Sequence, residues 1–105
     1  MAMTPEVRVK TVIKKYLTSI GAYFFSPIGG AFSAHGVPDL VGCWRGLFFG
    51  IEVKAPGKLK NTTENQRAHL DAIRAADGIS IVADDVKTVI DLFERLKLLT
   101  IVMGS

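Results

Sequence analysis

The chain is organised around the stretch Gly50-Ile51-Glu52-Val53-Lys54-Ala55-Pro56-Gly57. Its apolar residues predict a β-strand, yet an acid and an amine stand two residues apart within it. Because side chains alternate between the two faces of a strand, Glu52 and Lys54 share a face, and Ile51 and Val53 share the other. A buried charge is costly unless it is paired or binds something. The stretch therefore indicates either a structural Glu52–Lys54 ion pair or a functional site.

The hairpin that contains this strand brings a second acid towards it. Residues 39–44 and 47–55 read as two strands, and Arg45-Gly46 as the tight turn between them. Antiparallel pairing of these strands places Asp39 near Glu52. Two carboxylates and a lysine in one place could hold a divalent metal and a water beside a phosphate.

A helix is predicted to open the chain. Thr4-Pro5-Glu6 supplies a cap, a proline at the first helical position and an acid in the first turn, and the helix should run to about Ile20. Its expected apolar stripe comprises Val9, Val12, Ile13, Tyr16, Leu17 and Ile20. Glu6 extends that stripe by one turn, so we expect it to point inward or towards a cleft. The alternative is a glutamate that only complements the helix dipole.

A second helix is predicted to begin near Thr63. Thr63 and Gln66 have the spacing of a capping box, and Gln66 also continues the inward face of this helix, so both a capping role and a role in the cleft are open. Residues 22–26 and 79–83 read as further strands. The second of these follows a helix and is expected to pair in parallel. Asp84-Asp85 should cap a third helix.

The composition is that of a single globular domain spanning residues 1–105. Hydrophobic residues make up 49% and charged ones 22%, which argues against disorder. No apolar stretch reaches the ~20 residues of a membrane span, and the start lacks a secretion signal, so we expect a cytoplasmic location.

Cys43 cannot form an internal disulfide and is expected to pack among apolar neighbours rather than act as a nucleophile. Residues 98–105 fit a short strand, a dimer contact or a tail.

Basic residues are concentrated in the part of the chain that contains the central strand. Through Arg67 there are nine Lys and Arg residues against four acids, and from Ala68 onward there are four against six. This asymmetry suits a polyanion that approaches one side of the molecule. Solvated lysines on helices produce it as readily, so composition alone leaves both interpretations open.

The order of these elements resembles the PD-(D/E)xK nuclease superfamily, and within it the stand-alone phage and bacterial form of the virus-type replication-repair nuclease (VRR-NUC) family. A bare Asp…Glu-x-Lys pattern is common, whereas residues 52–58 followed by Thr and Gln are more specific. The matching pieces cover most of residues 5–85 and comprise Gly29-Gly30, Gly36-Val37-Pro38-Asp39-Leu40, Gly46, Glu52-Val53-Lys54-Ala55-Pro56-Gly57-Lys58, Thr63 to Gln66, and Gly78. The resemblance implies an α/β fold with a restriction-endonuclease-like core, in which helices flank a mixed sheet in the order α-β-β-β-α-β-α.

The resemblance also implies metal-dependent hydrolysis of phosphodiester bonds in DNA. Asp39, Glu52 and the Val53 backbone carbonyl would ligate Mg²⁺ or Mn²⁺, for which hard oxygen donors are suited. Lys54 would orient the attacking water or stabilise the charge that grows on the phosphate. Gln66 would help to position water or substrate.

Partners and accessory residues are implied in the same way. Glu6 would be an accessory acid from the first helix. Contacts to the DNA backbone would come from Lys10, Lys14, Lys58, Lys60 and Arg67, with His35 either a further contact or a solvated loop residue. Stand-alone members of the family resemble dimeric junction resolvases, so the favoured expectation is a homodimer that cuts branched DNA without an organic cofactor. The alternatives are a flap or other structure-specific nuclease, and a non-catalytic DNA-binding module.

Overall fold

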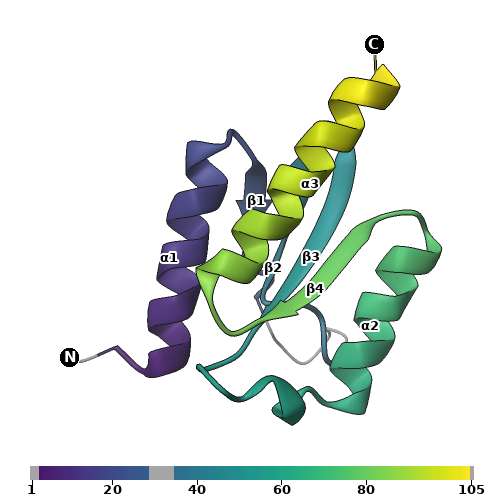
Figure 1. The fold of residues 1–105 in the computed structure, drawn as a ribbon. Coiled ribbons are helices and arrows are strands. Elements are labelled where there is room, and N and C mark those ends of the chain that lie inside the picture. Colours follow the sequence, from purple (N-terminus) through teal and green to yellow (C-terminus); the bar gives the residue numbers. More distant parts are fainter. Residues whose placement is uncertain (1–2, 29–34, 105) are drawn as a thin grey trace.

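The computed structural model describes residues 3–28 and 35–104, which form helical layers on both faces of one mixed sheet (Figure 1). In these residues the elements are α1 (Pro5–Ser19), β1 (Tyr23–Phe25), β2 (Leu40–Trp44), β3 (Leu47–Val53), the 3₁₀ helix η1 (Leu59–Asn61), α2 (Glu64–Ala75), β4 (Ile79–Ala83) and α3 (Val86–Gly104). The predicted α/β class and order of helices and strands are confirmed, and η1 adds one turn after β3. Gly29-Gly30, which contributes to the resemblance, lies outside the described residues.

The sheet has the strand order β1-β2-β3-β4 in the described part of the chain. β1 pairs with β2, and β2 with β3, in antiparallel fashion, whereas β4 returns through α2 to pair with β3 in parallel. The turn Arg45-Gly46 has φ angles of 52° and 81°, which are those of a two-residue type I′ hairpin turn. The resulting register pairs Leu40 with Ile51. Asp39 directly precedes Leu40, and Glu52 directly follows Ile51, so this register places Asp39 opposite Glu52.

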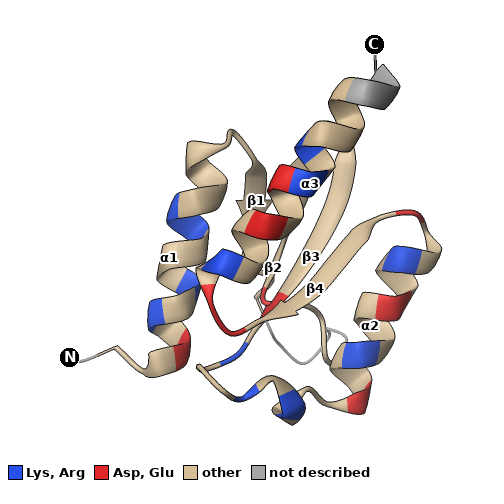
Figure 2. Cartoon of the chain, in the orientation of Figure 1, with Lys and Arg blue, Asp and Glu red and all other residues tan. Residues whose placement is uncertain are grey.

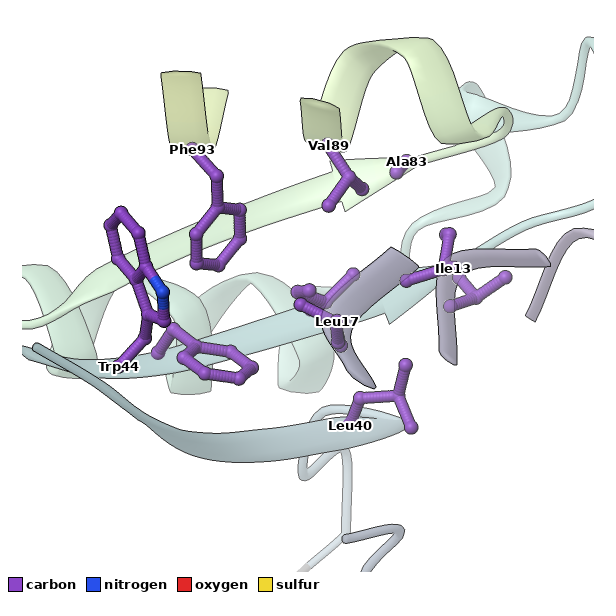
Figure 3. Packing of buried hydrophobic residues seen from close by; sticks show 10 residues of the cluster. Ile13, Leu17, Leu40, Trp44, Ala83, Val89 and Phe93 are labelled. Atoms are coloured by element: carbon purple, nitrogen blue, oxygen red, sulfur yellow. The ribbon is translucent and has the colours of Figure 1, made fainter. Parts of the chain in front are cut away.

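The core lies between the sheet and the helices α1 and α3 (Figure 3). The Phe93 ring of α3 packs edge-on against Trp44, Phe49 and Tyr16, with ring centroids 5.2, 5.4 and 6.3 Å away. Such aromatic pairs are worth about 0.5–1.5 kcal/mol each beyond the area that they bury. The other buried residues of this cluster are Ile13, Leu17, Leu40, Ile51, Val53, Ala83 and Val89.

Two expectations about packing are wrong. Val12 is 46% exposed, because it lies beside the buried stripe of α1 rather than within it. Cys43 is exposed, because it faces away from the core on a strand that α2 does not cover. Of the alternatives left open for residues 98–105, the short strand is excluded for 98–104, which continue α3 past the sheet (Figure 1), whereas the dimer contact stays a prediction.

Helix α2 covers the opposite face of β3 and β4. Gly50 leaves room for the helix, since a Cβ at this position would lie 2.6 Å from Cδ1 of Ile73. The Ser80 hydroxyl donates to the Leu70 carbonyl at 2.7 Å, and Arg74 donates to the Ser80 carbonyl at 2.9 Å. These bonds fix α2 across β4 and hold its first turn near the end of β3.

Gly36, in the turn before β2, is favoured both by its left-handed backbone and by the close approach of α2. Gly36 has a φ of 84°, and a Cβ at this position would lie 2.6 Å from the carbonyl carbon of Asn65 at the start of α2. Gly46 has a similar φ of 81°, but a Cβ there would meet nothing within 4 Å. The two positions therefore separate backbone strain from the close approach of two segments.

We predict that Gly36→Ala lowers the free energy of unfolding by about 2–4 kcal/mol and Gly46→Ala by only about 1–2 kcal/mol. Both substitutions strain a left-handed backbone, but only the first pushes the turn away from α2. Urea unfolding of the two variants measures the difference. Equal losses would contradict the close packing of this turn on α2.

Candidate metal centre

The site lies where β2 begins and β3 ends. Asp39 directly precedes β2, and its Oδ2 accepts a hydrogen bond from the Val53 N–H at 2.9 Å. In a strand the N–H and C=O of one residue point to the same side, so the Val53 carbonyl also leaves β3 on the side of β2. The ladder of β2 and β3 ends at the pair Leu40–Ile51, so Val53 has no partner residue on β2. The end of the ladder thus leaves the Val53 carbonyl on the same side as the Asp39 carboxylate.

Glu52 is the most buried charged residue of the site, with a side chain that is 4% exposed. Counted from the hairpin turn, Asp39 and Glu52 form a non-hydrogen-bonded antiparallel pair, in which facing side chains come closest. Burial, the charge of Asp39 and a hydrogen bond with it raise the pKa of Glu52 to about 7, although Lys54 acts to lower it. The two acids therefore lie next to each other as expected, and the repulsion between their charges disfavours the ionised form of Glu52.

Lys54 lies between Glu52 and helix α2. Its Nζ is 3.5 Å from Glu52 Oε2 and donates to Gln66 Oε1 at 2.9 Å. The same Gln66 oxygen accepts the Thr63 N–H at 2.9 Å, and the Gln66 N–H donates to Thr63 Oγ1 at 3.1 Å. Gln66 thus caps α2 and binds Lys54 at the same time. Within the described residues no hydrogen bond engages the Gln66 amide nitrogen, which leaves a donor for water or phosphate.

Helix α1 presents a lysine to the site in the place expected for a glutamate. Lys10 Nζ lies 3.6 Å from Asp39 Oδ1. Glu6, one turn earlier, is exposed, and no hydrogen bond or ion pair joins it to the site in the described part of the chain. The spacing relative to the apolar stripe of α1 predicted that Glu6 points towards the site. It predicts the same for Lys10, because the two residues are four apart on one face of the helix. The position of α1 along the sheet decides between them.

The predicted DNA-contacting residues lie on three segments, α1, the stretch around η1, and α2 (Figure 2). Lys14, Lys58, Lys60 and Arg67 are exposed, as is His35 in the turn before β2. Only Lys10 is engaged with a carboxylate of the site. The structure therefore leaves most of this basic set free to meet an anionic partner.

Asp84 has a role that its position as a predicted helix cap did not indicate. Its Oδ2 accepts the Gly57 N–H at 2.8 Å and so anchors the loop that leads from β3 to η1. Asp85 alone caps α3, accepting the Thr88 N–H at 2.9 Å. Because β3 and β4 are parallel, the segments that follow them begin side by side. An acid directly after β4 could therefore have been expected to bind the loop after β3.

The oxygen donors of the site fit Mg²⁺ or Mn²⁺. Two carboxylates and one main-chain carbonyl are hard ligands, and Mg²⁺ sites usually combine one or two carboxylates with waters and substrate phosphates. Among the described residues, no three His, Cys, Asp or Glu side chains are placed to hold a metal together.

No family model matches the chain, and no curated protein matches it. Within residues 3–28 and 35–104, no helix combines the length and apolar character needed to cross a membrane. What the site can do therefore follows from its own geometry and chemistry.

The raised pKa of Glu52 makes the stability of the metal-free protein depend on pH. The carboxyl has a pKa of 4.5 in the unfolded chain and about 7 in the folded protein, so the folded state holds an extra proton between these values. Its contribution, about 3 kcal/mol, is full below about pH 4.5 and is lost as the pH rises through about 7. We predict that Glu52→Gln, which is neutral throughout, removes this decline from thermal unfolding curves recorded with chelator.

Glu64→Gln is the matched control, because Glu64 is exposed in the first turn of α2. This variant should show the same decline as the wild-type protein. A decline that persists unchanged in Glu52→Gln would show that Glu52 is not the group that titrates.

Proposed function

We propose that the protein is a Mg²⁺- or Mn²⁺-dependent DNA endonuclease of the PD-(D/E)xK type, with VRR-NUC proteins as the family that it resembles. The observation that carries the proposal is the buried Glu52 carboxyl held against Asp39, with the Lys54 ammonium 3.5 Å away. A pair that served stability alone would be weakened by the second acid. A buried carboxyl whose pKa is raised by burial and by a neighbouring acid, and lowered by a neighbouring lysine, is typical of functional sites.

In this proposal the oxygens of Asp39, Glu52 and Val53 hold the cation. When bound, the ion supplies a Lewis acid that lowers the pKa of its water and neutralises charge on the phosphate. Lys54 orients the attacking water or stabilises the charge that develops on the phosphate. Gln66 fixes the Lys54 ammonium through its oxygen and offers its amide nitrogen to the water or to a phosphate oxygen.

The exposed basic residues near the site favour DNA as the anionic substrate. Lys58 and Lys60 flank the first residue of η1, Arg67 directly follows Gln66, and Lys14 lies one turn after Lys10. Such side chains bind phosphates without reading the base sequence, so binding should weaken steeply with salt. His35 is a further candidate for a phosphate contact.

Branched DNA is the favoured substrate, and a homodimer is the favoured active species. Two sites related by a twofold axis can cut a four-way junction symmetrically. Tyr23 and Phe25 on β1 are 71% and 51% exposed, and Phe48 on β3, beside α2, is 49% exposed, so these rings form an apolar surface of the kind that association covers. Paired cuts within one complex would support a resolvase, and single cuts a flap or other structure-specific nuclease.

We predict that the purified protein cleaves a synthetic four-way DNA junction with Mg²⁺ or Mn²⁺ and not with chelator. Asp39→Asn should slow cleavage by about 100-fold or more, since even groups that only support a metal ligand contribute about 10- to 100-fold. Junction binding should be retained, because the asparagine oxygen can still accept the Val53 N–H. Cleavage and binding are measured on the same panel of branched, flapped, nicked and linear DNAs at one salt concentration.

Asp71→Asn removes an exposed carboxylate from α2 and is the matched control. It should cut as fast as the wild-type protein. Full cutting by Asp39→Asn would contradict the proposed site. Binding by the wild-type protein without cutting in any metal would favour the non-catalytic DNA-binding module.

A further inference from the structure

We propose that Lys10 is a displaceable counter-ion of Asp39, with which a divalent cation has to compete, so that Lys10 sets the metal affinity of the site. The inference rests on the proposed function and concerns the regulation of the same site. It starts from the contact of 3.6 Å between Lys10 Nζ and Asp39 Oδ1, which the proposed reaction does not use.

Lys10 covers the oxygen of Asp39 that a cation would take. The other oxygen, Oδ2, already accepts the Val53 N–H at 2.9 Å. The Val53 N–H occupies one lone pair of Oδ2, so Oδ1 is the oxygen with more room for a cation, and the Lys10 ammonium lies beside Oδ1. Both groups would occupy the same side of one carboxylate, so they compete for it.

The charges of the site also disfavour a cation alongside both lysines. With the acids ionised, Asp39 and Glu52 balance Lys10 and Lys54, and each lysine lies within 3.6 Å of one carboxylate. A divalent ion adds two positive charges with nothing to offset them. Like charges repel strongly at such separations in a partly buried site. An ammonium has to move away unless a phosphate brings compensating negative charge.

Of the two lysines, Lys10 is the one able to leave. Lys54 is held by its hydrogen bond to Gln66 at 2.9 Å, and its side chain is only 11% exposed. Lys10 is 24% exposed, and its distance to Asp39 exceeds that of a good hydrogen bond. Its flexible stem allows the ammonium to turn outwards into water. Metal and phosphate should therefore bind cooperatively, each compensating a charge that the other leaves unbalanced.

The test is the affinity of the metal-free protein for Mn²⁺, measured by calorimetry and by the electron paramagnetic resonance signal of free Mn²⁺, without DNA. Lys10→Met should bind Mn²⁺ about three- to tenfold more tightly than the wild-type protein, because the ammonium it removes repels an ion of double charge. Lys10→Arg, which keeps the charge, should bind like the wild-type protein. Lys15→Met removes an exposed charge further along α1 and should change the affinity little. Circular dichroism verifies that α1 is retained in each variant.

The outcomes separate this inference from the proposed function. If Glu52→Gln abolishes Mn²⁺ binding but Lys10→Met changes it no more than Lys15→Met does, the counter-ion role is overturned and the proposed metal site stands. A wild-type protein that binds no Mn²⁺ overturns both. Tighter binding in Lys10→Met alone, with wild-type affinity in Lys10→Arg, supports the displaceable counter-ion.

Discussion

The site depends on one unfavourable contact, the burial of the Glu52 carboxyl beside Asp39 where β2 begins and β3 ends. The neighbouring groups each reduce its cost. The Val53 N–H binds Asp39, and Lys10 and Lys54 each face one of the acids. Stability alone does not require such a contact, because apolar residues of similar size would serve as well or better. A bound cation, by contrast, would turn the repulsion between the acids into shared ligation, and this is the physical reason to attribute the contact to function.

Much of this arrangement could be predicted from the sequence because it depends on local geometry. The alternation of side chains along β3 places Glu52 and Lys54 on one face, and the structure confirms that both lie on the side of α2. The two-residue turn Arg45-Gly46 fixes the hairpin register, which brings Asp39 opposite Glu52. The capping box that orients Gln66 likewise spans only four residues.

The features that could not be predicted depend on how distant elements pack. Glu6 and Lys10 share one face of α1, and only the position of that helix along the sheet selects Lys10. Cys43 is exposed because α2 covers β3 and β4 but not β2, which no pattern within β2 reveals. The apolar residues at 98–101 suit a strand as well as a helix, and the structure shows them in α3.

We propose that Asp39, Glu52 and the Val53 carbonyl together ligate a divalent cation. Anomalous diffraction from crystals soaked in Mn²⁺ locates the ion independently of any assay of cleavage. We expect a manganese peak about 2.1 Å from an oxygen of each of these three groups. A saturating soak that leaves these oxygens without a peak, or that places Mn²⁺ elsewhere, would contradict it.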